Sequence, residues 1–184
     1  VSDSEQLAKT EIFFTPYKGE IVMLYTGSEW VEYVLTSDLS VSVPATTVTP
    51  YDIFIDYNGG TPQLAATDWT NDTTRATALT TQDGVLVQTG NTDWKYLGTS
   101  RTTSVSGQSE LSETKVFLRN YYNRVDHVVK RHETDASWNK SNETIAYANA
   151  SSDNKIEIIE GWPEDAIDLK LLTSLTPGTT AAYG

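Results

Sequence analysis

The sequence predicts an all-β protein, namely an antiparallel β-sandwich or jelly-roll-like fold with at most one short helix. The first observation is composition: Thr is plentiful and the chain has ten Tyr and five Trp, residue types that favour a pleated, half-buried surface. The second is spacing, because short β-rich runs recur roughly every ten residues with turn-forming residues between them. At 184 residues and 38% hydrophobic, the chain is long enough to bury a core.

The expected organisation is one large β-domain with a different kind of segment at each end. We expect an N-terminal arm over 1–10, the β-sandwich domain over 11–175 and an extended C-terminal tail over 176–184. The β-sandwich domain could consist of two sub-sheets, with the division between them near 105–126.

The first strands are predicted from alternation and turn chemistry. A strand is expected over 11–17, followed by a hairpin of strands 20–25 and 29–35 around Thr26-Gly27-Ser28. A second hairpin is expected from strands 51–57 and 63–67. Its turn, Asn58-Gly59-Gly60, supplies the positive φ values that tight turns demand, so it is the strongest local signal in the chain.

The second half of the chain gives weaker signals. Asp83-Gly84 predicts a turn, with strands over 85–88 and 94–102. Residues 109–123 are ambiguous: the first of them resemble a capped helix, whereas the aromatic and β-branched residues from 116 to 122 suit a strand equally well. Further strands are expected at 128–132, 144–148, 155–160 and 167–172.

Charge and composition exclude several classes of function. The net charge of −12 and a pI near 4.4 disfavour binding to nucleic acid, since there is no Lys/Arg cluster to offset them. The chain has no Cys, which removes disulfides, thiolate nucleophiles and Cys-ligated zinc. No apolar run approaches ~18 residues, so membrane insertion is not expected.

No group of residues predicts catalysis. His127 and His132 would point to opposite faces of a predicted strand, which is poor spacing for a shared metal. Asp52 and Asp56 would share a strand face, and the simplest interpretation is a solvated face that alternates with Ile53. No Gly-x-Ser-x-Gly elbow surrounds any Ser. We therefore expect no enzyme activity, no cofactor and no metal.

Arginines and aromatic residues are the remaining candidates for a site. Arginine geometry suits buried or intersubunit pairing with carboxylates, so we hypothesise that the arginines in the middle of the chain meet acidic residues of a neighbouring copy. The candidate subunit-interface residues are Arg75, Arg101, Arg119, Tyr121, Tyr122 and Arg124. Trp and Tyr rings also form stacking platforms for sugars or anchors at interfaces. The candidate glycan or partner contacts are Trp69, Trp94, Trp138 and Trp162.

Several sequence words together resemble a β-rich module of tailed-bacteriophage virion structural proteins, which occurs in head fibres, decoration proteins and tail-associated fibres. The longest words are WTNDTTRA at 69–76 and NYYNRV at 120–125, and shorter ones are TPY at 15–17, YDIF at 51–54, DGV at 83–85, YLGT at 96–99 and RTT at 101–103. The resemblance spans 13–172 and carries over no catalytic residues. It implies a non-enzymatic virion protein on the particle exterior, expected to be a homotrimer.

Three function classes remain open at this point. The first is a capsid-decoration, cement or head-fibre protein that stabilises the particle and/or presents a host- or surface-binding module, with the major capsid protein or other virion proteins as partners. The second is a tail-fibre receptor-binding or carbohydrate-binding module, with a host surface glycan as partner. The third is an enzyme acting on polysaccharide, for which a pair of inward carboxylates would be required.

Overall fold

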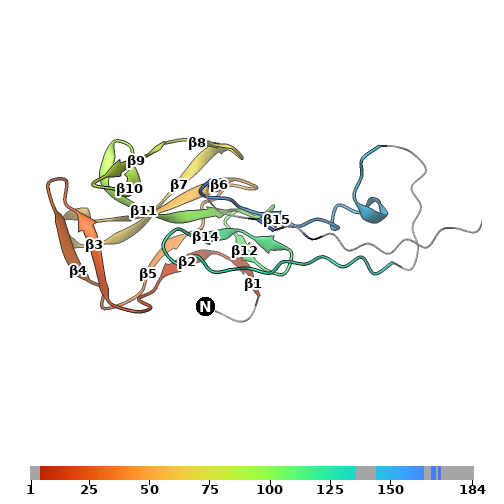
Figure 1. Ribbon diagram of the computed structural model, residues 1–184, viewed down its shortest axis with the longest axis horizontal. Coiled ribbons are helices and arrows are strands. Elements are labelled where there is room, and N and C mark those ends of the chain that lie inside the picture. The colour runs from red at the N-terminus through yellow and green to blue at the C-terminus, as the bar shows by residue number, and fades with distance from the viewer. Residues whose placement is uncertain (1–4, 136–143, 164–166, 169, 171–184) are drawn as a thin grey trace, which may run out of the picture.

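The protein is all-β, as the sequence predicts, and its centre is a curled antiparallel sheet of seven strands (Figure 1). The computed structural model describes residues 5–135, 144–163, 167–168 and 170. In spatial order the sheet contains β8 (Thr74–Arg75), β7 (Gln63–Asn71), β6 (Pro50–Asp56), β11 (Asn91–Arg101), β10 (Val85–Gln88) and β9 (Leu79–Gln82), with β14 (Leu118–Asn120) also paired to β11. The long central pair, β6 and β11, therefore has neighbours on both sides.

Three smaller sheets surround this one. β3 (Ile21–Tyr25) and β4 (Trp30–Val34) form a hairpin, and β2 (Glu11–Phe14) pairs with β5 (Leu39–Ser42). The third sheet has the order β1 (Gln6–Lys9), β12 (Ser109–Leu111), β13 (Lys115–Val116) and β15 (Glu157–Ile158). Its last pair, β13 with β15, is parallel, so the chain is back at the β-body at residues 157–158.

The core lies on both faces of β6. Tyr51, Ile53 and Ile55 belong to one buried cluster, which also contains Val22 and Leu24 of the β3–β4 hairpin. Because side chains alternate along a strand, the residues between them face the other way. Phe54 is one of these, and it belongs to a second buried cluster with residues of β10 and β11. Covering of both faces gives the sandwich-like arrangement.

The predicted turns are confirmed. Asp83-Gly84 joins β9 to β10 with φ values of 52° and 83°, the left-handed pair that a tight primed hairpin turn requires. Asn58-Gly59-Gly60 joins β6 to β7 as a short 3-10 turn with positive φ at all three residues. Thr26-Gly27-Ser28 connects β3 to β4.

Other local predictions need correction. Residues 109–123 contain three short strands and no helix, so the strand alternative is right there. Residues 6–9, which the sequence assigned to an arm, form β1 because they pair with β12. In the described part of the chain, 128–132 and 144–148 are not strands, and 155–160 contains only β15. Of 167–172, the described residues 167, 168 and 170 lie outside any strand, and the others, like the tail at 176–184, lie outside the described residues.

The missing strands have a common physical reason: among the described residues they join no ladder of backbone hydrogen bonds, although the Lys130 amide does donate to the Glu113 carbonyl oxygen at 2.7 Å. Residues 121–135 and 144–156 run side by side away from the β-body as an extended projection, here called the arm (Figure 1). The contacts that join its two stretches are side-chain hydrogen bonds, such as the one from Arg131 Nε to Asn154 Oδ1 at 3.0 Å. β-Favouring residues alone do not make a strand when no ladder of backbone hydrogen bonds is available. Within the described residues, no helix is long and apolar enough to cross a membrane.

Candidate functional site

Asp52 lies at the centre of a buried polar cluster, whereas the sequence had placed it on a solvated face. Its side chain is 2% exposed, and Asp56 on the same face of β6 is 6% exposed. The Thr99 hydroxyl on β11 donates a hydrogen bond to Asp52 Oδ1 at 2.6 Å, and the Tyr96 hydroxyl lies 2.7 Å from Thr99 Oγ1. The prediction of a solvated face is wrong because β6 is a central strand that is covered on both faces.

Arg75 forms an ion pair with the buried carboxylate of Asp52 and also contacts Trp69 and Gly161. Its Nε donates to Asp52 Oδ2 at 2.7 Å, and its guanidinium lies 4.4 Å from the centroid of the Trp69 ring. One of its terminal nitrogens donates to the carbonyl oxygen of Gly161. The planar fork of an arginine serves several acceptors at once, which a lysine does not do. Arg75 therefore ties the backbone at Gly161 to the main sheet, and we call this arrangement the clamp.

The clamp requires glycine at position 161. A Cβ atom added there would lie 2.8 Å from both Cβ and Oγ1 of Thr99 and 3.0 Å from the Tyr96 hydroxyl. These distances are shorter than real Cβ contacts allow, so the close approach of this backbone to β11 depends on the missing side chain.

A cluster of aromatic rings lies beside the clamp, on the same side of the sheet. Tyr121 is central to them, with ring centroids 5.6 Å from Tyr96 and 5.9 Å from Trp162. Phe54 lies 5.9 Å from Trp94 and 6.0 Å from Tyr96. Such tilted and edge-on contacts are the preferred geometries of aromatic pairs. They fix Trp162 against the base of the arm.

Burial controls the protonation of the cluster. Burial raises the pKa of Asp52 above its ordinary value of 3.8, while the hydrogen bond from Thr99 and the charge of Arg75 oppose that rise. The desolvation of the carboxylate is the largest of these effects. A buried ion pair of this kind contributes less to stability than its short distance suggests, although the loss of one partner is costly.

Two buried tyrosines predict a fall in stability at alkaline pH. Burial raises the pKa of both Tyr51 and Tyr96 from 10.0 to about 12. Between these values the unfolded chain loses phenolic protons that the folded chain retains, so the free energy of unfolding falls as pH rises from 10 to 12. The fall is up to roughly 2–3 kcal/mol for each phenol. Urea unfolding over this pH range measures it, and Tyr51→Phe should make the fall shallower; an identical slope in that variant would contradict the assignment.

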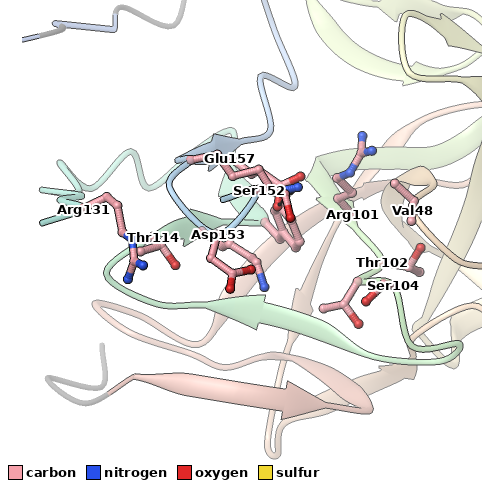
Figure 2. Close-up of a pocket in the computed structure, with 13 residues that line it drawn as sticks. Val48, Arg101, Thr102, Ser104, Thr114, Arg131, Ser152, Asp153 and Glu157 are labelled. Atoms are coloured by element: carbon pink, nitrogen blue, oxygen red, sulfur yellow. Dashed lines mark ion pairs between the residues drawn. The ribbon is translucent and has the colours of Figure 1, made fainter. Parts of the chain in front are cut away.

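A polar cleft lies where the arm meets the β-body (Figure 2). Its volume is about 400 Å³, and Figure 2 shows Arg131 of the arm on one side, Arg101 of β11 on the other and Asp153 of the arm between them. Three cations of the cleft have carboxylate partners: Lys155 Nζ lies 3.2 Å from Glu157 Oε2, and Arg101 and Lys115 bind carboxylates outside the cleft. Besides hydroxyls and cations, the cleft contains the carboxylates of Asp153 and Glu157.

The six candidate interface residues fall into three places. Arg75 is committed to Asp52 and Gly161 of its own chain, and Arg101 Nη1 lies 2.7 Å from Asp72 Oδ1 of its own chain. Tyr121 belongs to the aromatic cluster of the clamp. The other three residues line a groove beside β14, here called the basic groove: Arg119, Tyr122 and Arg124. The hypothesis that the arginines bridge subunits stays a prediction.

The candidate tryptophans lie mostly against the core. Trp69 is 9% exposed, and Trp94 and Trp162 are partly buried beside the Phe54 cluster. Trp138 lies outside the described residues. A sugar-stacking platform requires an open ring face, which Trp69 does not have.

Sequence reasoning missed Asp52, Thr99 and Gly161. A partial signal for Asp52 was present in the run PYDIFID at 50–56: Tyr51, Ile53 and Ile55 make one face apolar, and the other face carries Phe54 beside Asp52, which fits a strand covered on both faces. Thr99 and Gly161 carried no local signal, since their roles arise from a contact between segments 62 residues apart.

We found no metal-binding cluster among the described residues and no similar protein that would help to assign a function. The described residues contain no group of three or more His, Asp or Glu side chains that could hold a metal ion. Comparison of the chain with protein-family models, with curated proteins and with solved structures found no match. The assignment of a function therefore depends on the sequence words and on the geometry.

Proposed function

We propose that this chain is a non-enzymatic structural protein on the exterior of a bacteriophage particle, of the capsid-decoration, cement or head-fibre type. It acts as a homotrimer, stabilises the particle through the major capsid protein or other virion proteins, and/or presents a host- or surface-binding module. The observation that carries this proposal is the arm.

The arm exposes apolar side chains that a chain acting alone has no reason to expose. Val128 is 90% exposed and Ile145 is 97% exposed, and they lie on the two stretches of the arm. Exposed extended backbone is a template for pairing with another chain, and strand addition is a common way in which proteins join assemblies. The arm is therefore suited to contact a neighbouring virion protein, while the β-body remains folded on its own core.

The sequence words that resemble the phage module build the connection between body and arm. WTNDTTRA at 69–76 ends β7, forms β8 and supplies Arg75 of the clamp. NYYNRV at 120–125 ends β14 and supplies Tyr121, against which Trp162 packs. The words thus supply residues that hold both ends of the arm to the sheet, which fits a part that transmits mechanical load.

A tail-fibre receptor-binding or carbohydrate-binding module is the second candidate. The polar cleft of Figure 2 favours it, since its hydroxyls and charged groups are the kind that hold a sugar. The buried Trp69 does not favour it.

Immunogold electron microscopy of intact particles, with an antibody against this chain, tests the proposal. Gold over the head surface supports a decoration or head-fibre role. Gold at the tail tip supports the second candidate, and glycan arrays then become the next measurement. Particles that carry no gold, although the same antibody detects the purified chain, would overturn both.

The role of the arm gives a separate prediction. The double variant Val128→Asp, Ile145→Asp should bind particles lacking the chain at least tenfold more weakly in co-sedimentation, because it places charge in an apolar contact. Its thermal unfolding should stay unchanged, since both side chains are exposed. Val105→Asp is the matched control, because Val105 is 52% exposed but lies in the β-body. Equal binding by the arm variant and the control would exclude the arm as the contact.

A further inference from the structure

The basic groove is a recess with largely apolar walls. It has a volume of about 620 Å³ and lies between the connection from β2 to β3 and the residues around β14. Several large apolar side chains on its walls are exposed, with Tyr17 71%, Ile21 62% and Phe13 58% exposed. A recess with exposed rings and aliphatic side chains is typical of a site for another polypeptide.

The charge of the groove is opposite to that of the chain. The chain has 13 Lys or Arg and 25 Asp or Glu residues. Four of the cations and a single acid, Glu20, line the groove; the cations are Lys18, Lys95, Arg119 and Arg124. Such a concentration of positive charge in an acidic protein attracts an acidic partner and repels a basic one.

Lys95 is the cation of the groove whose surroundings are most directly known. Its Nζ lies 3.2 Å from the Met23 carbonyl oxygen and 4.9 Å from the centroid of the Tyr122 ring. No carboxylate of the described residues forms an ion pair with it, and burial lowers its pKa. A partly buried cation that is held by a carbonyl and a ring would be stabilised by an incoming carboxylate.

The chain itself contains a segment of matching chemistry, PEDAIDLKLL at 163–172. It combines three acids with five apolar residues and has one Lys. In an extended conformation Asp165 and Ile167 would share a face, because strand side chains alternate with period two. The segment follows Trp162, which packs against Tyr121, and the Tyr121 ring centroid lies 5.1 Å from that of Tyr122 in the wall of the groove, so the segment starts near the groove. In its own chain, Ile167 is 54% exposed and does not line the groove.

We propose that the basic groove of one copy binds residues 163–172 of a second copy of this chain. The apolar residues of the segment contact the exposed rings, and its carboxylates pair with Lys95 and the cations at the rim. A contact between two different surfaces is head-to-tail, and it closes into a ring when the rotation between copies permits. The proposal concerns self-association alone, so it holds or fails independently of where a particle would carry the protein.

Light scattering coupled to size-exclusion chromatography of the full chain tests the proposal. The unaltered chain should be an oligomer. Lys95→Glu should raise the dissociation constant by roughly tenfold or more, because it places a carboxylate against the acidic segment. Lys9→Glu changes the net charge equally on exposed β1, outside the groove, and should leave the mass unchanged. Far-UV circular dichroism and thermal unfolding of each variant confirm that the fold is retained.

Exchanging the charges of Lys95 and Asp165 tests whether residues 163–172 are the segment that binds the groove. Asp165→Lys should weaken the oligomer in the same way, and the double variant Lys95→Glu, Asp165→Lys should recover at least part of the loss. Ile167→Asp should also dissociate the oligomer, since Ile167 is exposed and its substitution does not disturb the described core. A monomeric unaltered chain, or an oligomer that neither Lys95→Glu nor Ile167→Asp weakens, would overturn the proposal.

Discussion

Arg75→Ala is expected to lower the free energy of unfolding by about 3–5 kcal/mol, the cost of leaving one partner of a buried ion pair alone. Asp52 is 2% exposed, and Arg75 is the only charged group that forms an ion pair with it among the described residues. The substitution also removes the hydrogen bond to the Gly161 carbonyl and the contact with the Trp69 ring. Chemical denaturation of the variant measures the loss.

Arg101→Ala is the matched control for this prediction. Arg101 forms an ion pair of the same length, 2.7 Å, but its partner Asp72 is 63% exposed. An ion pair with an exposed partner contributes about 0–1 kcal/mol, so the control should unfold almost as the unaltered chain does. Equal losses in Arg75→Ala and Arg101→Ala would show that burial of Asp52 does not decide the effect.

A double substitution separates the cost of an unpaired charge from the value of the pair. Asp52→Asn combined with Arg75→Met removes both charges while keeping much of the volume, and it should be more stable than Arg75→Ala. Acid should also reduce the defect of Arg75→Ala. The pKa of Asp52 is raised in the folded protein, so stability falls as pH rises from 3.8 to that higher value. Without Arg75 the carboxyl titrates at still higher pH, and the defect should shrink as the carboxyl becomes protonated.

Gly98→Ala is expected to cost about 3 kcal/mol, at the upper end of the usual range for overpacking. A Cβ atom at this position would lie 2.1 Å from the carbonyl oxygen of Arg119 and 3.1 Å from its carbonyl carbon. Both atoms belong to the backbone of β14, which pairs with β11 at Gly98, so no side-chain rotation relieves the clash. The added methyl group should push β14 away and loosen Tyr121 behind it.

Gly19→Ala is the control for Gly98→Ala. A Cβ atom at Gly19 meets nothing within 4 Å, and its φ is not in the left-handed region. The control should therefore change the free energy of unfolding by less than about 0.5 kcal/mol. Limited proteolysis adds a local readout: in Gly98→Ala, cleavage after position 120 should be faster than in the control. Unchanged stability and cleavage in Gly98→Ala would mean that β14 does not pack on β11 as described.

Arg75→Ala and Gly98→Ala should both weaken the attachment of the arm to the β-body. The clamp holds the chain at Gly161, and the pairing of β14 with β11 holds it at residue 120, so together they anchor both ends of the arm. In the proposed virion role, loss of either anchor should reduce attachment to the particle even where the arm itself is unaltered. Particle binding by Arg75→Ala and Gly98→Ala, at a temperature where both remain folded, measures that coupling.

Local signals in the sequence determined the all-β class and the principal hairpins. Asn58-Gly59-Gly60 and Asp83-Gly84 specify turns because few residues adopt positive φ, and the runs beside them alternate or are apolar throughout. These signals act over a few residues, so they are readable without knowledge of the partners.

Tertiary structure alone decided which segments find partners. Val128 and Ile145 have the same β-favouring character as the residues of β6, yet no strand of the described residues pairs with them, and they are exposed on the arm. Asp52 looks like a surface residue until β7 and β11 flank its strand and Thr99 and Arg75 supply its hydrogen bonds. Strand pairing and burial depend on contacts between distant residues, and the free energy of those contacts is not contained in any one local run of sequence.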